Sequence, residues 1–446
     1  MSTEPTTPDV IVVGAGLAGS LLALLLSQAG LSTHVYDYRA DPRNPTGEPT
    51  KRSRSINLAI STRGLTALAE AGLSEKVTAI GVPMHGRCVH PPSASSPLQL
   101  QRYGQPGEYL LSVSRHRLNN LLLDACQEAK GITLVFGTRC VDADLDAPAV
   151  TLQPRDGGES VRATATLIVG ADGSFSKVRA AMARRDRFNF SQSYVSAAYK
   201  ELTMVNLNPD TAKHAFPAEW LHIWPRHRFM LIALPNDATS FTCTLFMDKD
   251  EIDDLDSTAK IHAFFMRNFP DAVKCMPMLA EDFANNPTPS LLTIRCDPYN
   301  YMGKAIIIGD AAHAIVPFYG QGCNAAFEDC RLFVDSVKKH GWGELKLAAE
   351  EYASARKKNA DAIADLAIDH YEDMRLEVLA NRLFPQSFLP LYSMISFSNT
   401  PYAEAVERAD KQEMVVGRGL LVVGAAAVGA AAVLTARRYA IKARPM

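Results

Sequence analysis

A glycine-rich turn near the N-terminus constrains the fold of this chain more than any other feature. Gly14, Gly16 and Gly19 have the spacing G-x-G-x-x-G, between a β-branched run at 9–13 and a stretch of helical composition at 20–30. In a strand–turn–helix context the first glycine permits a tight turn, the second lets a pyrophosphate approach the backbone, and the third lets the helix pack on the strand. The free N–H groups at the start of the helix then face the phosphates. The turn therefore predicts a bound dinucleotide.

An acidic residue follows this turn at the end of a second β-like run. Residues 33–38 read THVYDY, so the chain from 9 to 38 is expected to form one β-α-β unit. Asp37 has the spacing of a carboxylate that binds the hydroxyls of a ribose. An acid suits a ribose without a 2′-phosphate, which favours FAD or NAD over NADPH in this site.

Two further motifs each follow an apolar, strand-like run. Asp172 lies in the sequence GADGS, which alone is equally typical of a turn between a strand and a helix. Asp310 lies in GDAAH, where a carboxylate directly after a buried strand can bind the ribityl hydroxyls of a flavin. The loop after this motif leads into a helix expected over 325–337, whose positive end favours the negative charge of a reduced flavin ring. His313 in the same motif is more typical of a structural residue than of a catalytic one.

The order of strand-like and helical runs predicts the fold class. We expect an α/β protein with a Rossmann-like βαβ FAD-binding domain, discontinuous in sequence, a β-sheet-rich substrate domain, a helical C-terminal region and a C-terminal transmembrane helix. The predicted boundaries are 9–80, 110–185 and 295–343 for the FAD-binding domain, 81–109 and 186–294 for the substrate domain, 344–412 for the helical region and 415–438 for the membrane anchor.

The transmembrane helix is predicted from an uncharged run near the C-terminus. Residues 419–436 read GLLVVGAAAVGAAAVLTA, with Arg418 before them and Arg437 and Arg438 after them. As a helix this run would be roughly 27 Å long, about the thickness of one bilayer core. A buried, alanine-rich helix is the alternative interpretation, but the flanking cations favour a membrane anchor.

Charge and cysteine content exclude two other classes of protein. The net charge is −2, whereas a nucleic-acid-binding protein usually carries a strong basic excess. The eight cysteines include no C-x-x-C pair and are too sparse for a disulfide-stapled fold, so we expect reduced thiols in a cytosol-facing protein. The N-terminus lacks the basic and apolar regions of a secretory signal. No pattern of metal ligands stands out.

The dinucleotide fingerprint and the two acidic motifs, in this order, resemble those of the FAD-dependent aromatic hydroxylases that use a single FAD domain. The resemblance implies FAD as the bound cofactor, NADPH as a cosubstrate and O2 as the oxidant, with a flavin hydroperoxide that hydroxylates the substrate. It implies no side chain acting as acid, base or nucleophile and no catalytic metal. Residues 417–424 superficially resemble a second fingerprint, but no strand precedes them.

Several stretches are similar, more narrowly, to the kynurenine 3-monooxygenase family, from about residue 9 to about residue 412. This resemblance implies hydroxylation of L-kynurenine to 3-hydroxy-L-kynurenine. It also implies a location in the mitochondrial outer membrane with the catalytic domain facing the cytosol. Two alternatives stay open: a related flavin hydroxylase or epoxidase of a phenolic, polyketide or lipid substrate, and a membrane-tethered flavoprotein scaffold. The stretches are RSINLA at 54–59, LLSVSR at 110–115, LHIWPR at 221–226, FTCTLF at 241–246, GDAAHAIVPF at 309–318 and FLPLY at 388–392.

The family holds the carboxylate of its substrate with an arginine and two tyrosines. The resemblance implies Arg87, Tyr103 and Tyr392 for these roles. A guanidinium can bind a carboxylate through two parallel hydrogen bonds. From the sequence alone, the arginine would be read as a surface cation and the first tyrosine as a turn residue.

Other residues expected beside the substrate are Phe318 and Gln321, with Tyr319 packing nearby. The chain departs from the family at one point, because the family asparagine that follows a Met-Arg pair has no counterpart directly after Met374 and Arg375. The nearest asparagine is Asn381, and no role is assigned to it. The cofactor is expected to contact Gly14, Gly16, Leu17, Ala18, Gly19, Asp37, Arg39, Arg115, Asp172, Asp310, Pro317, Gly320, Gln321, Gly322, Cys323 and Asn324.

Overall fold

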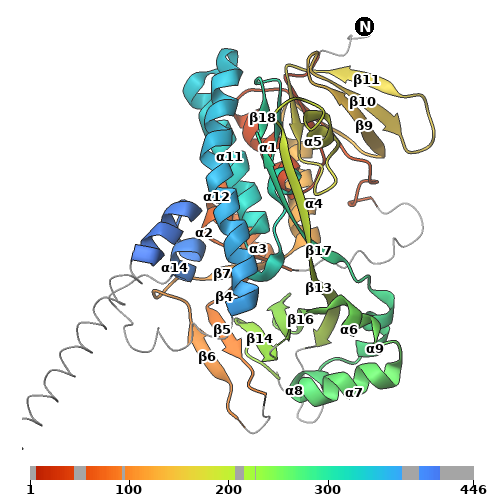
Figure 1. The fold of residues 1–446 in the computed structure, drawn as a ribbon, viewed down its shortest axis with the longest axis vertical. Helices are drawn as coiled ribbons and strands as arrows, with labels where there is room; N and C mark the ends of the chain where they lie inside the picture. The colour runs from red at the N-terminus through yellow and green to blue at the C-terminus, as the bar shows by residue number, and fades with distance from the viewer. Residues whose placement is uncertain are drawn as a thin grey trace, which may run out of the picture.

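The computed structural model describes most of the 446-residue chain. The described residues are 7–44, 57–92, 96–205, 215–226, 228–373 and 391–411. Two sheets dominate them, one in each half of the molecule, and helices pack against both (Figure 1).

A six-stranded sheet, in the order β18-β19-β12-β1-β2-β8, forms the first half of the molecule. All its strand pairs are parallel except β18–β19. Its central strands β1 and β12 are buried along their whole length, as expected for β-branched runs covered on both faces. The strands are β1 (Val10–Val13), β2 (Thr33–Tyr36), β8 (Ile132–Val135), β12 (Leu167–Gly170), β18 (Asn300–Tyr301) and β19 (Ala305–Ile307).

Helices α1, α4 and α11 pack together beside this sheet and share its hydrophobic core. A second, three-stranded sheet of order β11-β10-β9 lies at the same end of the molecule, next to α5 (Figure 1). The elements are α1 (Leu17–Gln28), α4 (Arg115–Glu128), α5 (Lys177–Met182), α11 (Gly322–His340), β9 (Thr138–Asp144), β10 (Ala149–Pro154) and β11 (Val161–Thr164).

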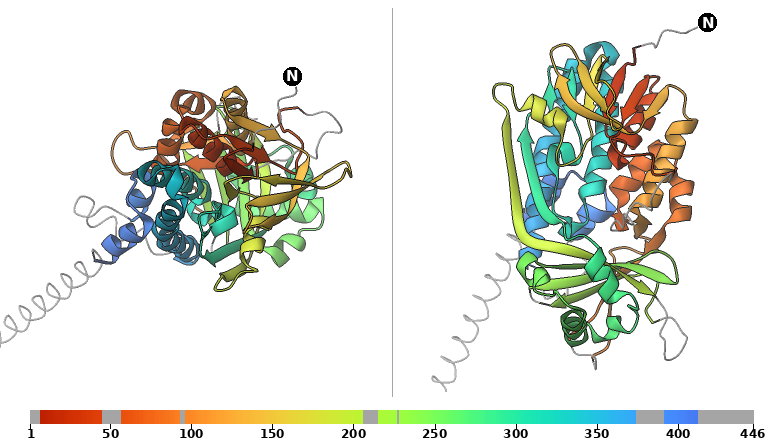
Figure 2. Two further views of the ribbon diagram at one scale, coloured as in Figure 1. Left: turned by 90° about the horizontal axis from the view of Figure 1, so that it is seen from above. Right: turned by 90° about the vertical axis from the view of Figure 1, so that its right-hand side faces the viewer.

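A seven-stranded sheet, in the order β17-β13-β16-β15-β14-β5-β6, forms the second half. Strand β13 has 17 residues and pairs with β17 along its first part and with β16 along its second, so it runs through both halves of the molecule (Figures 1 and 2). The strands are β5 (Gly86–Val89), β6 (Gln99–Arg102), β13 (Asn189–Val205), β14 (Leu221–Arg226), β15 (Phe229–Pro235), β16 (Ser240–Asp248) and β17 (Ser290–Asp297).

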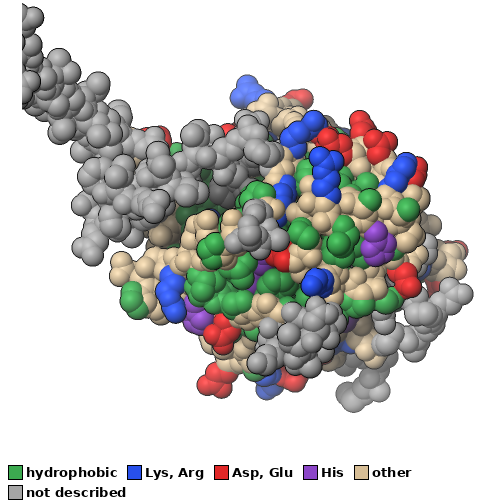
Figure 3. Space-filling model, turned by 90° about the horizontal axis from the view of Figure 1, so that it is seen from below, with side chains coloured by type: hydrophobic (Ala, Val, Ile, Leu, Met, Phe, Trp, Pro, Cys, Tyr) green, Lys and Arg blue, Asp and Glu red, His purple; other side chains and the backbone are tan. Residues whose placement is uncertain are grey.

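Four short helices cover the outer face of this sheet, over a core of Trp224, Phe241, Phe265 and their neighbours. Figure 3 looks onto this end of the molecule, where hydrophobic side chains gather in the middle of the face and charged ones surround them. These helices were not predicted from the sequence, because they lie inside a region expected to be rich in strands. They are α6 (Lys249–Asp253), α7 (Thr258–Asn268), α8 (Pro270–Val273) and α9 (Leu279–Asn285).

The remaining elements connect the two halves. A small sheet of order β3-β7-β4 lies near α2 and α3, and α12 runs beside α11 and close to β17 and β18. A third hydrophobic core joins α12 and α14 to the seven-stranded sheet. The elements are β3 (Asn57–Ile60), α2 (Thr62–Glu70), α3 (Ser74–Ile80), β4 (Val82–Met84), β7 (Leu110–Ser114), α10 (Asp310–His313), η1 (Pro317–Tyr319), η2 (Trp342–Glu344), α12 (Leu345–Asp373) and α14 (Leu391–Phe397).

The β-α-β unit, the α/β class of the first half, the sheet-rich second half and the helical C-terminal region all agree with the sequence analysis. The domain boundaries stay a prediction. Strand β4, which those boundaries assign to the substrate domain, pairs with β7 rather than with the seven-stranded sheet.

The predicted transmembrane helix is corrected. Within the residues that the structure describes, no helix combines the length and the apolar composition needed to cross a membrane. The longest of them, α12, has 29 residues, but acidic and basic side chains recur along its whole length. The expected binding to a membrane through this helix is therefore withdrawn as well. The run at 415–438 lies outside the described residues.

Candidate functional site

The three predicted nucleotide motifs meet at one edge of the six-stranded sheet. Val13 is in register with Gly170, and Gly170 with Ile307, so three parallel strands end side by side. Each then continues into one of the motifs. In open α/β sheets this carboxyl edge is where nucleotides bind.

The glycine-rich turn has the shape that its spacing predicts. Gly14 has φ of 107°, and a Cβ there would lie 2.4 Å from the carbonyl oxygen of Ala171. A Cβ on Gly19 would lie 1.9 Å from the oxygen of Gly14, so helix and turn are in direct contact. Around Gly16, by contrast, a Cβ would meet nothing within 4 Å. This is the open side on which a diphosphate can approach the backbone.

Helix α1 begins directly after Gly16, and no side chain caps its N-terminus. The N–H groups of Leu17 and Ala18, its first two residues, are therefore placed to receive an anion. The backbone of the turn and the uncapped helix together fit a phosphate-bearing cofactor.

Asp37 lies just after β2, with a side chain that is 3% exposed. Its carboxylate accepts hydrogen bonds from the backbone of Ala15 at 2.9 Å and from Arg39, through the backbone N–H at 2.8 Å, Nε at 2.9 Å and Nη2 at 2.7 Å. The Arg39 side chain is half exposed. A ribose that donates its hydroxyls to Asp37 would therefore displace the guanidinium of Arg39, which is free to turn toward solvent.

Asp172 has a structural contact that the sequence did not reveal. One carboxylate oxygen accepts the backbone N–H of Lys177 at 2.6 Å, at the start of α5, and the other is buried without a hydrogen-bond partner in the described structure. Burial raises the pKa of this carboxyl. Because this oxygen is buried, the expected contact of Asp172 with the cofactor stays a prediction.

Arg179 joins two of the motifs, and the sequence analysis gave it no role. It donates from Nη1 to the carbonyl of Ala311 at 2.7 Å and from Nη2 to the carbonyl of Ser174 at 2.5 Å. The arginine thus fixes the distance between the loop after β12 and helix α10. A basic residue five to seven positions after a GADGS loop was the available signal.

Asp310 begins α10 with an exposed side chain, after Gly309 at φ of 56°. Arg115, the first residue of α4, is also exposed. Burial raises the pKa of the Cys323 thiol to about 12, while the charge of Arg115 lowers it and that of Asp310 raises it further. The charges of two predicted cofactor residues thus act on the thiol of a third.

The loop before α11 presents backbone rather than side chains. Pro317 begins the short helix η1, Gly320 ends it at φ of 67°, and Gly322 starts α11 without a side-chain cap. The side chain of Asn324 is already hydrogen-bonded within the protein. Its oxygen accepts the backbone N–H of Ser61 at 2.9 Å, and its nitrogen donates to the backbone carbonyls of Ala59 at 3.0 Å and Gly320 at 3.1 Å. At this position only the backbone N–H is left for a cofactor.

The residues at this edge fit FAD. They offer an open diphosphate turn, a carboxylate beyond β2, a second carboxylate after β19 and the uncapped start of α11. These are groups that can bind phosphates, ribose, ribityl hydroxyls and an isoalloxazine ring.

A second site lies where β5, the loop after β6 and α14 meet. Arg87 of β5 lies over the ring of Tyr392, with Cζ 4.0 Å from the ring centroid. The ring of Tyr103 is 5.9 Å from that of Tyr392. The structure therefore brings together the three residues predicted to bind the substrate carboxylate.

This pocket contains polar atoms that lack partners. The Nε atom of Arg87 and the hydroxyl of Tyr103 are both buried without a hydrogen bond in the described structure. Burial raises the pKa of Tyr103 well above its ordinary value, so its hydroxyl stays a neutral donor. Among the described residues, no carboxylate pairs with Arg87. A buried Nε of Arg87 and a buried hydroxyl of Tyr103, both without acceptors among the described residues, fit an anionic ligand.

Aromatic rings enclose these polar groups. Tyr319 lies 5.7 Å from Tyr392, and Phe397, which the sequence analysis missed, lies 5.2 Å from Tyr103. Phe318 packs edge-to-face on Phe246 at 5.3 Å. Gln321 is buried, and its side-chain oxygen accepts the hydroxyl of Tyr402 at 3.2 Å. Residues 374–390, which include Met374, Arg375 and Asn381, lie outside the described residues.

A buried ionic network supports the cofactor edge from behind. Asp329 accepts hydrogen bonds from His313 at 2.6 Å, from the backbone of Gly309 at 2.8 Å and from Nε of Arg356 at 2.6 Å. Glu328 pairs with Arg356 at 2.5 Å and with Arg63 at 2.7 Å. Burial opposes ionisation of Asp329, but the charges of His313 and Arg356 lower its pKa. His313 is thus a structural residue, as its sequence context favoured.

Comparison with known proteins agrees with this assignment. A family described as FAD binding domain matches residues 7–367. A kynurenine 3-monooxygenase of Flavobacterium psychrophilum is 40% identical over 423 residues, covering 91% of this chain and 92% of that protein. One from Dictyostelium discoideum is 40% identical over 426 residues, covering 89% of each.

Solved structures show the same fold at lower identity. 2-methyl-3-hydroxypyridine-5-carboxylic acid oxygenase has a TM-score of 0.68 at 19% identity, covering 90% of this chain and 98% of that one. PqsL of Pseudomonas aeruginosa, in complex with 2-aminobenzoylacetate, has a TM-score of 0.65 at 21% identity, covering 83% of this chain and 98% of that one.

Proposed function

This chain belongs to the kynurenine 3-monooxygenase family, and from that membership we propose that Arg87, Tyr103 and Tyr392 hold the carboxylate of L-kynurenine during its hydroxylation. The protein is an FAD-dependent monooxygenase with NADPH as cosubstrate and O2 as oxidant. Its product is 3-hydroxy-L-kynurenine.

The observation that carries the proposal is that two buried polar atoms in the aromatic pocket, Nε of Arg87 and the hydroxyl of Tyr103, lack hydrogen-bond partners in the described structure. Each is a donor for which the described part of the chain offers no acceptor. A carboxylate supplies two acceptor oxygens and one negative charge, so it satisfies both donors at once. A phenol, polyketide or lipid without an acidic group would leave these atoms unpaired, and the pocket therefore favours an amino-acid substrate.

When bound, FAD supplies the redox chemistry and the activation of oxygen. The chain's own residues position the substrate and exclude water. The carboxylate contact fixes one end of the substrate, and the rings of Tyr319, Tyr392 and Phe397 restrict how the aromatic end can lie. The amino group of the substrate already activates the carbon ortho to it, so orientation is the protein's main task. That no side chain acts as acid, base or nucleophile stays a prediction.

The test compares kynurenine with an analogue in which hydrogen replaces the carboxylate. FAD-loaded protein is incubated with NADPH, air and either compound, and the products are identified by mass. We expect 3-hydroxy-L-kynurenine from kynurenine, and turnover of the analogue at least about tenfold less efficient, since the donors of Arg87 and Tyr103 stay unpaired. Equal efficiency with both compounds would remove the carboxylate assignment while leaving the hydroxylase activity in place.

The expected location, at the mitochondrial outer membrane with the catalytic part facing the cytosol, stays a prediction that rests on the family resemblance and not on the withdrawn helix. All eight cysteines are described, and all are free thiols, which suits a reducing compartment. Cell fractionation followed by protease treatment of intact mitochondria tests it. Recovery of the protein away from mitochondria would contradict the prediction.

A further inference from the structure

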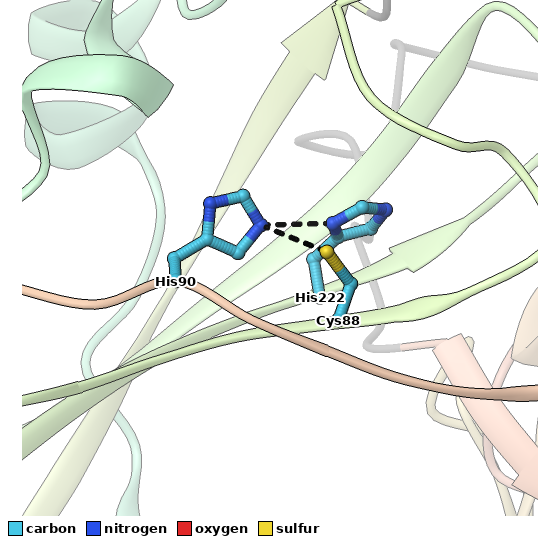
Figure 4. A group of neighbouring side chains, drawn as sticks. All are labelled: Cys88, His90 and His222. Atoms are coloured by element: carbon cyan, nitrogen blue, oxygen red, sulfur yellow. Dashed lines mark hydrogen bonds between the residues drawn. The ribbon is translucent and has the colours of Figure 1, made fainter. Parts of the chain in front are cut away.

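Three side chains with metal-binding atoms lie together on the outer face of the seven-stranded sheet. Cys88 belongs to β5, His90 follows that strand, and His222 belongs to β14 (Figure 4). The two strands are parallel neighbours in which Cys88 and His222 are register partners. All three residues are buried, and their sulfur and nitrogen atoms lie within 4.8 Å of one another.

The hydrogen bonds at the outer side of each histidine fix which ring nitrogen carries a hydrogen. His222 Nε2 lies 2.8 Å from the carbonyl oxygen of Pro217, which only accepts, so Nε2 must donate. His90 Nδ1 lies 2.6 Å from Asp271, whose carboxylate also accepts the indole N–H of Trp224 at 3.0 and 3.1 Å. His90 therefore donates from Nδ1.

Two lone pairs are consequently directed at each other in the interior. His90 Nε2 and His222 Nδ1 are 2.9 Å apart, and in neutral imidazoles both are acceptors. Two acceptors at this distance repel unless a positive charge lies between them. That charge is either a proton, which would make one ring an imidazolium, or a metal ion.

The position of Cys88 decides between these occupants. A shared proton needs only the two nitrogens, but the sulfur of Cys88 is 3.7 Å from the same nitrogen of His90. Around a tetrahedral zinc ion, with Zn–N near 2.0 Å and Zn–S near 2.3 Å, ligand atoms lie roughly 3.3–3.6 Å apart. The two separations that involve His90 Nε2, 2.9 and 3.7 Å, require shifts of only a few tenths of an ångström, and the third, from Cys88 Sγ to His222, is within 4.8 Å.

We propose that Cys88, His90 and His222 bind one Zn2+ ion. The ligand set of one thiolate and two imidazoles suits zinc, and the hydrogen bonds from His90 to Asp271 and from His222 to Pro217 are the outer contacts that orient zinc-bound histidines. Three protein ligands leave the fourth position to a water molecule. The sequence analysis predicted no metal site, because the parallel pairing of β5 with β14 cannot be read from the chain.

The ion would connect two strands directly behind the substrate pocket. Successive side chains of a strand point to opposite faces, so Arg87 and Cys88 lie on opposite sides of β5. The zinc ion on one face therefore holds in place the strand that presents Arg87 on the other. Its role is structural, and it takes no part in the hydroxylation.

The test measures metal content in the full-length, FAD-loaded protein. The protein is expressed with added zinc, purified through an affinity tag that binds no metal, and analysed by elemental mass spectrometry. We expect about one zinc per chain. Less than about one tenth of a zinc per chain, or another metal in its place, overturns the proposal, and a shared proton then accounts for the short contact between the histidines. This result does not depend on hydroxylase activity.

Variants identify the ligands. Cys88→Ser is expected to lower the zinc content at least about tenfold, and Asp271→Asn to weaken zinc binding about 10–100-fold through loss of the outer contact. Cys243→Ser is the matched control, since Cys243 is a buried thiol of the same sheet on β16. Equal zinc content in Cys88→Ser and Cys243→Ser would overturn the assignment. If Cys88→Ser does not fold, the zinc content of the unaltered protein alone decides.

Discussion

Two arginines of this protein, one buried and one partly buried, have opposite surroundings. Arg356 is 1% exposed and pairs with two buried carboxylates, those of Glu328 and Asp329. Arg87 lies against Tyr392, has a buried Nε atom without a partner, and pairs with no carboxylate among the described residues. Within the described residues, the first arginine is neutralised by carboxylates of the chain, whereas the second has none and its Nε lacks an acceptor.

The difference indicates two roles: the network around Arg356 supports the fold, and Arg87 recognises a ligand. A buried charge without a partner is costly, so folding alone gives no reason to keep Arg87 where it is. The network around Arg356 instead connects α2, α10, α11 and α12 behind the cofactor edge, and all its carboxylates have cationic partners. Substitutions in the network should therefore change stability, and substitutions in the pocket should change binding.

The largest effect is expected for Arg356→Met. The variant leaves Asp329 and Glu328 buried with fewer partners, and we expect it to lower the free energy of unfolding by about 3–5 kcal/mol. Denaturant titration measures this. The control is Lys339→Met, which breaks the exposed pair with Glu351 and should cost less than about 1 kcal/mol. Equal losses of unfolding free energy in the two variants would contradict the stabilising role of the buried network.

The counterpart in the pocket is Arg87→Met. Binding of L-kynurenine to the FAD-loaded protein should weaken by about 2–5 kcal/mol, because its carboxylate loses a buried partner. The free energy of unfolding should change by less than about 1 kcal/mol, since no ion pair among the described residues is broken. Titration with kynurenine in the absence of NADPH gives the first value. Arg102→Met, on the neighbouring strand β6 with an exposed side chain, is the control. An unchanged dissociation constant for Arg87→Met would remove its proposed role.

Removal of a single hydroxyl, that of Tyr103, tests the same contrast between binding and stability. Tyr103→Phe removes a hydroxyl that has no partner in the described structure, so the ligand-free protein should lose no stability. Kynurenine binding should weaken by about 0.5–1.5 kcal/mol, the net value of one hydrogen bond. Tyr194→Phe, which alters an exposed tyrosine, serves as the control. A loss of stability equal to the loss of binding would show that the hydroxyl is structural.

The smallest effect concerns pH. Because the pKa of Asp329 is lowered in the folded protein, its ionised form contributes stability that is present above the unfolded-state pKa and is lost only as pH falls through the lower, folded-state value. The difference in unfolding free energy between the unaltered protein and Asp329→Asn should stay nearly constant from about pH 7 to about pH 5, and shrink below about pH 4. A difference that already shrinks near pH 6 would contradict the lowered pKa.

The cofactor edge could be predicted because its information is local. Gly14, Gly16 and Gly19 each have a requirement that a few neighbouring residues impose, and a strand on one side with a helix on the other completes the pattern. Parallel strands then bring the motifs at Asp172 and Asp310 to the same edge. The resemblance to a family supplied Arg87 and Tyr103, which sequence reasoning alone would have read as surface and turn residues.

The rest depends on partners that are distant in the chain. Arg63, Glu328 and Arg356 form one network although up to 293 positions separate them, and no pattern in the sequence connects them. Helices α7 and α9 cover the sheet through Phe265 and Phe283, but their region was expected to consist mainly of strands. Phe397 reaches the pocket only because α14 returns to Tyr103.

The long strand β13 limits how this protein can be divided. It pairs with β17 from Asn189 onward and with β16 as far as Val205, so one continuous hydrogen-bonded ribbon belongs to both halves. A chimaera that transplants the substrate sheet onto another flavoprotein cannot be joined within a loop here, because any junction would cut this ribbon. Exchange of substrate range between relatives should therefore proceed by replacing individual side chains rather than whole modules.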